Sequence, residues 1–306
     1  MAVLLIDTYS LFFRAFHALP PMNTQSGEPT SALYGFSSLL LKLLREEQPE
    51  GCAFALDRRE PTFRHDAYAD YKGTRSAAPS DLVRQLGRLE ELLGALGMPS
   101  FSARGFEADD VLATLAARLC TERDVLVASG DRDMLQLVSA RVEVLFLGQR
   151  GKPAQRYDLD AVRKRFGIGP ERLPLYVALL GDTSDNIPKV KGVGPRAAEE
   201  LATRFADVET LLAELDTIEN TRLRELLSRH AEQLRASQAL VRLRRDVPLP
   251  EGPHFAGLTR EAVQATRTLF ATLEFKSLFP RLEALGERAS SEREAAQAPR
   301  DHGSSV

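Results

Sequence analysis

The stretch Val125-Leu-Val-Ala-Ser-Gly-Asp-Arg-Asp133 runs from a Val-rich apolar segment directly into two acids. A short apolar run of this kind is typical of a strand that is covered on both faces of a parallel sheet. Three further runs share the pattern, at residues 3–6, 52–56 and 142–147. The sequence therefore predicts buried, neighbouring strands.

Helix-length amphipathic stretches separate these runs. Residues 31–47, 82–96 and 111–119 each place their large apolar side chains on one helical stripe. Strands that alternate with helices predict an α/β fold with a mostly parallel central sheet flanked by helices. Ligands of such a sheet gather at the carboxyl ends of its strands.

The second half of the chain changes character. From about Leu159 the strand pattern fades, and the helical patterns include residues 197–204, 208–215 and 221–242. We therefore expect an α/β region at residues 1–160, a helical region at 161–285 and a disordered tail at 286–306, where Ala, Ser, Glu and Arg dominate.

Composition places the chain among ordinary globular proteins. It has 306 residues, 43% of them hydrophobic and 27% charged. No apolar run approaches the roughly 18 residues of a membrane span, and the first residues lack a basic start or cleavage site. We therefore expect no membrane partner and a cytoplasmic location. Cys52 and Cys120 fit reduced thiols better than a disulfide or zinc framework.

Nine acids follow strand ends, open a helix or share a loop. They are Asp7 and Asp57 at two strand ends, Asp131 and Asp133 after a third, Glu107, Asp109 and Asp110 at the start of a helix, and Asp182 and Asp185 in a loop. Any one of them alone is most simply a cap, a turn former or a solvated charge. At one sheet edge they need cations, because two unit charges about 4 Å apart repel by about 4 kcal/mol at an effective dielectric of 20.

Metal ions are the cations that these residue types favour. Hard oxygen ligands without nearby His or Cys select Mg²⁺ or Mn²⁺ over zinc. This many carboxylates can hold two ions about 3.5–4 Å apart. Such a pair suits phosphodiester hydrolysis, in which one ion prepares a hydroxide and both stabilise the phosphate and the leaving oxygen.

A basic segment at residues 58–80 follows the second strand. It interleaves Lys and Arg with Phe63, Tyr68 and Tyr71. Such a composition suits nucleic acid, because aromatic stacking is worth about 1–3 kcal/mol per base and cations neutralise phosphate. Core packing and substrate contact both remain open for Phe63 and Tyr68. His65 is interpreted as structural, because it has no second His with which to bind a metal.

Several blocks of sequence occur together in a fixed order. They are Phe63-Arg64-His65 with Tyr71-Lys72-Gly73, Gly105-Phe106-Glu107-Ala108-Asp109-Asp110, Gly130-Asp131-Arg132-Asp133, and Gly181-Asp182-Thr183-Ser184-Asp185-Asn186 followed by Gly192-Val193-Gly194. With the acids, they resemble the 5′-nuclease (flap endonuclease) family, in particular the 5′→3′ exonuclease domain of bacterial DNA polymerase I. The resemblance covers the chain from Val3 to about Leu285.

The resemblance implies a function for each region. Residues 1–160 would form a PIN-like α/β metal-dependent nuclease core, with a helical arch or gateway at 58–80. Residues 161–285 would carry a helix-hairpin (H3TH) DNA-binding turn at 186–204.

The resemblance also implies which acids bind metal. The first ion would be held by Asp7, Asp57, Glu107 and Asp109, and the second by Asp131, Asp133, Asp182 and Asp185, with Asp110 close by. Both ions would be Mg²⁺, with Mn²⁺ as a substitute, and a K⁺ ion at the hairpin turn is a further option.

The implied DNA contacts lie in the gateway and at the hairpin turn. Lys72 and Arg75 would grip the scissile phosphate and assist its charge as catalytic residues, Tyr71 would stack on a base, and Arg14 would lie near the site. The remaining contacts would be Lys191, Gly192, Val193, Gly194 and Arg196, where glycines let backbone amides approach a phosphate at a helix N-terminus.

The implied protein is a free-standing, structure-specific 5′→3′ exonuclease and 5′-flap endonuclease of replication and repair. It would act on DNA with 5′ flaps, nicks or RNA primers, beside DNA polymerase and ligase, as a monomer in the bacterial cytoplasm and nucleoid. Two alternatives are a catalytically impaired DNA-binding paralogue and a PIN-type ribonuclease. The complete set of nine acids disfavours the first, and the gateway and hairpin blocks disfavour the second.

The acid cluster also accounts for the net charge. The chain carries 43 acids against 40 Lys and Arg, a formal charge of −3, which alone argues against a nucleic-acid partner. Without the nine clustered acids, 34 acids face 40 basic residues. The mild acidity therefore reflects the metal site, and DNA binding is expected to weaken when the metals are removed.

Overall fold

The computed structural model describes residues 2–75, 77–148, 153–251 and 254–297, of which 290–297 are described by backbone alone. Its centre is a six-stranded sheet in the order β3-β2-β1-β4-β5-β6. The strands are β1 (Val3–Asp7), β2 (Gly51–Ala55), β3 (Ser100–Phe101), β4 (Val125–Ser129), β5 (Val142–Phe146) and β6 (Gln155–Tyr157). Only the β5–β6 pairing is antiparallel among these strands, so the predicted mostly parallel sheet is confirmed.

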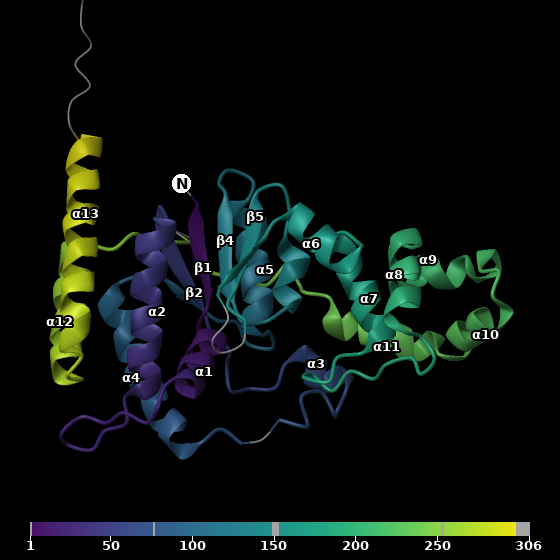
Figure 1. Ribbon diagram of the computed structural model, residues 1–306, viewed down its shortest axis with the longest axis horizontal. Helices are drawn as coiled ribbons and strands as arrows, with labels where there is room; N and C mark the ends of the chain where they lie inside the picture. Colours follow the sequence, from purple (N-terminus) through teal and green to yellow (C-terminus); the bar gives the residue numbers. More distant parts are fainter. Residues whose placement is uncertain (1, 76, 149–152, 252–253, 298–306) are drawn as a thin grey trace, which may run out of the picture.

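Two hydrophobic cores lie on the two faces of the sheet, because successive side chains of a strand point to opposite faces. Leu4 and Ile6 of β1 belong to the first core, whereas Val3 and Leu5 belong to the second. The first core is covered by α1 (Thr8–Ala18), α2 (Ser31–Glu47), α4 (Ser80–Leu96), α12 (Arg260–Thr272) and α13 (Phe279–Gln297). The second is covered by α5 (Ala108–Leu119) and by the helices between β6 and α12 (Figure 1).

These later helices extend the second core away from the sheet (Figure 1). They are α6 (Leu159–Phe166), α7 (Leu173–Leu180), α8 (Pro195–Arg204), α9 (Val208–Ala213), α10 (Thr221–Arg229) and α11 (Ala231–Val241). Short 3₁₀ turns are η1 (Asp133–Leu137), η2 (Pro170–Arg172), η3 (Leu215–Thr217) and η4 (Lys276–Leu278). The predicted helix over 221–242 is two helices, because the backbone of His230 leaves helical geometry between α10 and α11.

The gateway segment is less helical than predicted. Within residues 58–80, α3 (Phe63–Ala67) is the described helix that precedes α4, and turns and extended backbone fill most of the rest. Lys72 has a φ of 55°, in the left-handed region that a right-handed helix cannot contain. The described part of the segment is therefore an irregular strap rather than a helical arch.

The C-terminal helices return to the sheet. α12 packs against α4, and α13 packs against α2, so residues 260–285 lie on the opposite face from α7–α11 (Figure 1). α13 continues to Gln297, so residues 286–297 are helical and the prediction of a disordered tail is wrong there. Ala, Glu and Arg are strong helix formers, which explains the error. Residues 298–306 lie outside the described residues. Of the helices that the structure describes, none is long and apolar enough to span a membrane.

Candidate metal and phosphate site

The carboxyl edge of the sheet carries the first pair of acids. Asp7 is the last residue of β1, and its side chain caps α1 by accepting from the Ser10 amide at 3.2 Å. The other Asp7 oxygen accepts from the Ser129 hydroxyl at the end of β4, at 2.5 Å. Asp57 follows β2, and one of its oxygens accepts from the Ala108 amide at 2.8 Å. Parallel strands thus bring Asp7 and Asp57 to one edge, as predicted.

The N-terminus of α5 supplies the next acids. Glu107 is the N-cap, and its side chain and that of Asp110 form a reciprocal capping box with the backbone. Asp109 lies in the first helical turn. Acids are favoured here because the first amides of a helix lack partners and the helix dipole is positive at this end.

The third group of acids lies on two loops. One Asp131 oxygen accepts from the Asp133 amide at 2.9 Å at the start of η1. Asp182 accepts from the Ser184 amide and hydroxyl, each at 2.6 Å. This loop depends on Gly181, which has a φ of 72° and whose added Cβ would lie 2.5 Å from the Ile187 carbonyl oxygen.

The acids influence one another strongly. Burial first, and then the Asp57 and Asp131 carboxylates, raise the pKa of Asp7 to about 7, although the hydrogen bonds from Ser129 and Ser10 oppose the rise. Burial also raises the pKa of Asp109 well above its usual range, with Asp131 and Asp7 as the next causes. The pKa of Asp133 is raised in the same way by burial and by Asp131. The structure therefore places the acids of the strand ends, α5 and η1 within reach of one another's charge.

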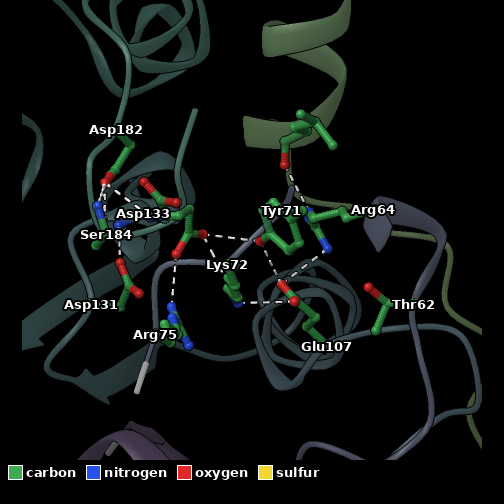
Figure 2. A network of polar contacts seen from close by, with 12 residues as sticks. Thr62, Arg64, Tyr71, Lys72, Arg75, Glu107, Asp131, Asp133, Asp182 and Ser184 are labelled. Carbon is green, nitrogen blue, oxygen red and sulfur yellow. Dashed lines mark hydrogen bonds and ion pairs between the residues drawn. The ribbon is translucent and has the colours of Figure 1, made fainter. Parts of the chain in front are cut away.

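Two gateway cations lie between the groups of acids (Figure 2). Lys72 Nζ is 2.9 Å from Glu107 Oε1 and 3.9 Å from Asp185 Oδ2. Arg75 Nη2 is 2.7 Å from Asp185 Oδ1. The backbone amide of Lys72 also donates to the Asp185 carbonyl, at 3.1 Å. Both predicted catalytic cations thus lie at the site, where they neutralise Glu107 and Asp185.

The remaining acids have no such partner. Among the residues that the structure describes, six of the predicted metal ligands form no ion pair with Lys, Arg or His: Asp7, Asp57, Asp109, Asp131, Asp133 and Asp182. In the same described ranges no three Asp, Glu, His or Cys side chains are arranged closely enough to hold an ion as they stand. The donor set nevertheless suits Mg²⁺ or Mn²⁺, because it is made of oxygens and carries uncompensated negative charge.

Asp110 differs from the other eight acids. It is fully buried, and its two oxygens accept from Arg64 Nη1 at 2.6 Å and Arg64 Nη2 at 2.8 Å. The amides of Glu107 and Arg244 also donate to it, at 3.2 and 2.9 Å. Because both oxygens are occupied by these donors, the structure removes Asp110 from the candidate metal ligands.

Tyr71 also lies differently from the prediction. Its side chain is only 3% exposed, so its ring has no face free to stack on a base. Its hydroxyl is 3.1 Å from Glu107 Oε2 and 2.9 Å from Asp185 Oδ2 (Figure 2). The ring packs edge-on against His65, whose Nδ1 caps α3 through Thr62 as a structural residue. Tyr71 therefore joins two candidate ligands from inside the protein.

Phe63 and Tyr68 both pack against other side chains. Phe63 is half-buried, and its ring lies 5.9 Å from the ring of Phe106 between centroids. Tyr68 packs against the small cluster that contains Tyr71. Both observations favour the core-packing alternative.

The predicted hairpin turn lies between the Asp182–Asp185 loop and α8. Gly192 has a φ of 107°, and Gly194 is the N-cap of α8 with Pro195 in its first turn. The Arg196 side chain is 93% exposed, whereas Val193 is buried. The turn therefore presents cations and backbone, and Val193 offers only its backbone to a ligand.

Arg14 forms a hydrogen bond to the backbone. Its Nη1 donates to the Leu147 carbonyl at 2.6 Å. The side chain lines a pocket of about 350 Å³ between α1 and α2, with Lys42, Arg45 and Arg281. Its contact with DNA remains a prediction.

Three residues at the site were not assigned a role from the sequence. Arg64 neutralises Asp110, the Ser129 hydroxyl binds Asp7, and the Asn186 side chain donates to the Asp70 carbonyl at 2.8 Å, which ties the gateway to the Asp185 loop. Ser129 ends an apolar strand and could have been inferred. A buried Arg64 could not, because the sequence gives it the same appearance as its exposed neighbours.

Both halves of the chain match one family of nucleases. Residues 2–167 match the model of the 5′-3′ exonuclease N-terminal resolvase-like domain, and residues 168–263 match the model of the 5′-3′ exonuclease C-terminal SAM fold. The chain belongs to the 5′-3′ exonuclease family.

Similar curated proteins are bacterial DNA polymerases. DNA polymerase I of Bacillus caldotenax is 40% identical over 286 residues, which are 92% of this chain and 32% of the relative. DNA polymerase I of Mycobacterium leprae is 39% identical over 293 residues, 94% of this chain and 32% of the relative. The chain spans about a third of the length of these relatives.

Solved structures show the same fold. The bacteriophage T5 D15 protein co-crystallised with metal ions superposes with a TM-score of 0.63 at 18% identity, over 93% of this chain and 98% of the other. The catalytic core of Rad2 in complex with DNA substrate superposes with a TM-score of 0.62 at 18% identity, over 93% and 92%.

Proposed function

We propose that this chain is a divalent-metal-dependent hydrolase that cleaves phosphodiester bonds at 5′ ends and 5′ flaps of DNA, and in RNA primers paired to it. The observation that carries the proposal is the group of six carboxylates without a cation partner, among the described residues, that lie within reach of one another's charge at the carboxyl edge of the sheet. Membership of the 5′-3′ exonuclease family supports it.

Eight acids would hold two Mg²⁺ ions, with Mn²⁺ as a substitute. One ion would be bound by Asp7, Asp57, Glu107 and Asp109, and the other by Asp131, Asp133, Asp182 and Asp185. Ions of this kind lower the pKa of a bound water and neutralise charge on a phosphate. A T5 5′-exonuclease with a similar fold has been solved with zinc as the bound divalent ion, which supports a divalent requirement.

The gateway cations would bind the substrate phosphate. Lys72 and Arg75 now neutralise Glu107 and Asp185. Divalent ions at these acids would release both side chains, whose N–H groups could then bind the oxygens of the scissile phosphate. Tyr71 would keep Glu107 and Asp185 in place while this exchange occurs.

The hairpin turn would bind the duplex beyond the cleavage point. Lys191 and Arg196 are exposed there, and the amides that follow Gly192 precede the start of α8. A K⁺ ion at this turn, cooperation with DNA polymerase and ligase, a monomeric state and a place in the bacterial cytoplasm and nucleoid belong to the same proposal.

One substrate panel tests the proposal. The full chain is incubated with a 5′-flap duplex, a nicked duplex and single-stranded RNA, with Mg²⁺ or with a chelator. We expect flap cleavage that requires Mg²⁺ and that Asp131→Ala and Asp182→Ala abolish. Asp160→Ala is the matched control, because this side chain is 94% exposed and its pairing is with Arg163 on the same helix. DNA binding without cleavage would favour the impaired paralogue, and preferred cleavage of RNA would favour the ribonuclease.

A further inference from the structure

Arg64 is the largest fully buried residue in the part of the chain that the structure describes. We propose that Arg64 and Asp110 are a positioning pair, which fixes the Glu107 carboxylate for metal binding and links it to the end of α11. The inference rests on the proposed function, because Glu107 matters only if it is a ligand. Neither residue would touch metal or DNA.

The pair joins three parts of the molecule. Arg64 comes from α3 in the gateway, and Asp110 comes from the first turn of α5. Arg64 Nε donates to the Leu240 carbonyl at the end of α11, at 2.7 Å, and Nη2 lies 3.4 Å from the Arg242 carbonyl oxygen. The Arg64 guanidinium therefore connects the end of α11 directly to the first turn of α5, so a movement of α11 would also move Asp110.

Glu107 is held by the pair at two points. Its backbone amide donates to Asp110 Oδ2 at 3.2 Å, and its Oε2 lies 3.4 Å from Arg64 Nη1. The Tyr71 hydroxyl contacts the same oxygen of this carboxylate, and Lys72 contacts the other. The orientation of a carboxylate that ligates metal is commonly set by such outer contacts.

Stability alone is a poor explanation for this arrangement. An apolar pair of similar volume is often as stable as a buried ion pair, or more stable, whereas removal of one partner leaves a costly buried charge. A guanidinium also offers two parallel donors in a fixed plane, which suits it to hold a carboxylate in one orientation. The geometry therefore points to orientation of Glu107 as the role of the pair.

The test separates position from stability. Mn²⁺ alone is titrated by calorimetry into the full chain and into Arg64→Met, Arg64→Lys and the double variant Arg64→Met with Asp110→Leu. The temperature is one at which circular dichroism shows each protein to be folded. Arg88→Met is the matched control. Arg88 lies on α4, outside the acid cluster, and pairs with Glu28 and Glu91.

We expect Arg64→Met to weaken Mn²⁺ affinity about 10- to 100-fold, as is typical for loss of an outer contact to a ligand. Arg64→Lys should fall between it and the unaltered protein, because it keeps the charge but loses the forked contact. The double variant should recover part of the melting temperature that Arg64→Met loses, because no unpaired charge stays buried although the Glu107 and Arg244 amides lose their acceptor, and it should keep the weak Mn²⁺ affinity. Arg88→Met should bind Mn²⁺ normally.

Two results would overturn the inference. One is normal Mn²⁺ affinity both in Arg64→Lys and in Arg64→Met, or in the double variant if the single variant does not fold. The other is a double variant that recovers Mn²⁺ affinity together with its melting temperature, because the pair would then act through stability alone. Failure of the unaltered chain to bind Mn²⁺ would instead overturn the proposed function, which the flap assay would show independently.

Discussion

Asp109 and Asp110 are adjacent in the sequence and lie in the same helical turn, yet their surroundings are opposite. Asp110 is fully buried and bound by Arg64 on both oxygens. Asp109 has no cation at ion-pair distance in the described chain, and burial together with the Asp131 and Asp7 carboxylates raises its pKa well above the usual range. One step along the helix rotates a side chain by about 100°. This rotation turns Asp110 toward Arg64 in the interior and leaves Asp109 among other carboxylates, where a bound cation would neutralise it.

Substitution of Asp109 should give the largest effect in this comparison. Asp109→Asn should reduce Mg²⁺-dependent flap cleavage about a thousandfold or more, because bound metal supplies several kcal/mol of transition-state stabilisation. Its melting temperature without metal should stay equal or rise, since a charge with a raised pKa is removed. Single-turnover cleavage and thermal melting measure the two effects, with Asp160→Asn as the exposed control. Cleavage within tenfold of the unaltered protein would exclude Asp109 as a ligand.

Asp110 should show the opposite pattern in a stability experiment. Asp110→Ala leaves the Arg64 charge buried without its partner, which should lower the free energy of unfolding by about 3–5 kcal/mol. Urea unfolding in the presence of chelator measures this. Glu28→Ala is the comparison, because it breaks an Arg–Glu pair that is about one-third exposed and should cost about 1 kcal/mol or less. Equal losses of unfolding free energy in the two variants would mean that the buried Arg64–Asp110 pair contributes no more to stability than a partly exposed pair.

Much of the fold followed from the sequence, because the strong patterns are local. Residues 31–47 and 125–129 coincide with α2 and β4, since the first has a regular helical hydrophobic period and the second is an unbroken apolar run. β3 and β6 were not anticipated, because strands of two and three residues are too short to show a period. The break at His230 was missed for a similar reason, because α10 and α11 together read as one amphipathic stretch.

The candidate site was predictable in its acids and in the gateway cations Lys72 and Arg75, but not in the buried contacts of Arg64 and Tyr71. The convergence of Asp7 with Asp131 follows from parallel strand ends, which is a property of topology. By contrast, the burial of Tyr71 and Arg64 depends on where the irregular gateway packs against α5 and α11. Contacts of that kind join residues far apart in the sequence, and neither hydrophobic period nor spacing encodes them.

Unpaired carboxylates should also make the metal-free protein sensitive to pH. The pKa of Asp7 is raised from 3.8 to about 7 in the folded state, so between these values the folded chain binds a proton that the unfolded chain has lost. The contribution of Asp7 to the free energy of unfolding should therefore be fully present below about pH 4, and should be lost as the pH rises through 7. Each tenfold change in proton affinity is worth about 1.4 kcal/mol, or about 2 °C in the melting temperature of a chain of this length.

Melting curves in chelator between pH 5 and pH 8 measure the contribution of Asp7 to stability. The comparison is between the unaltered chain and Asp7→Asn, which is isosteric and does not titrate. The unaltered chain should lose more stability across the range, and Mg²⁺ should remove the difference at pH 8 by binding the ionised form. Parallel curves for the two proteins would show that Asp7 ionises normally and would weaken the distinction between paired and unpaired acids.

Tyr71 offers the finest test, because its hydroxyl joins the two acids that Lys72 and Arg75 neutralise. Tyr71→Phe keeps the buried ring and removes only the hydroxyl that contacts Glu107 and Asp185. If the hydroxyl positions these ligands, the variant should lose about 1 kcal/mol of stability and show weaker Mn²⁺ affinity. If the ring instead stacked on a base, Phe would replace Tyr without loss of cleavage. Tyr157→Phe is the matched control, because Tyr157 is also a buried residue, and its hydroxyl donates to Gln155 on β6 and accepts from Arg165, outside the acid cluster. Loss of stability in both variants with loss of Mn²⁺ affinity in Tyr71→Phe alone would show that the gateway acts on the metal ligands from within the fold.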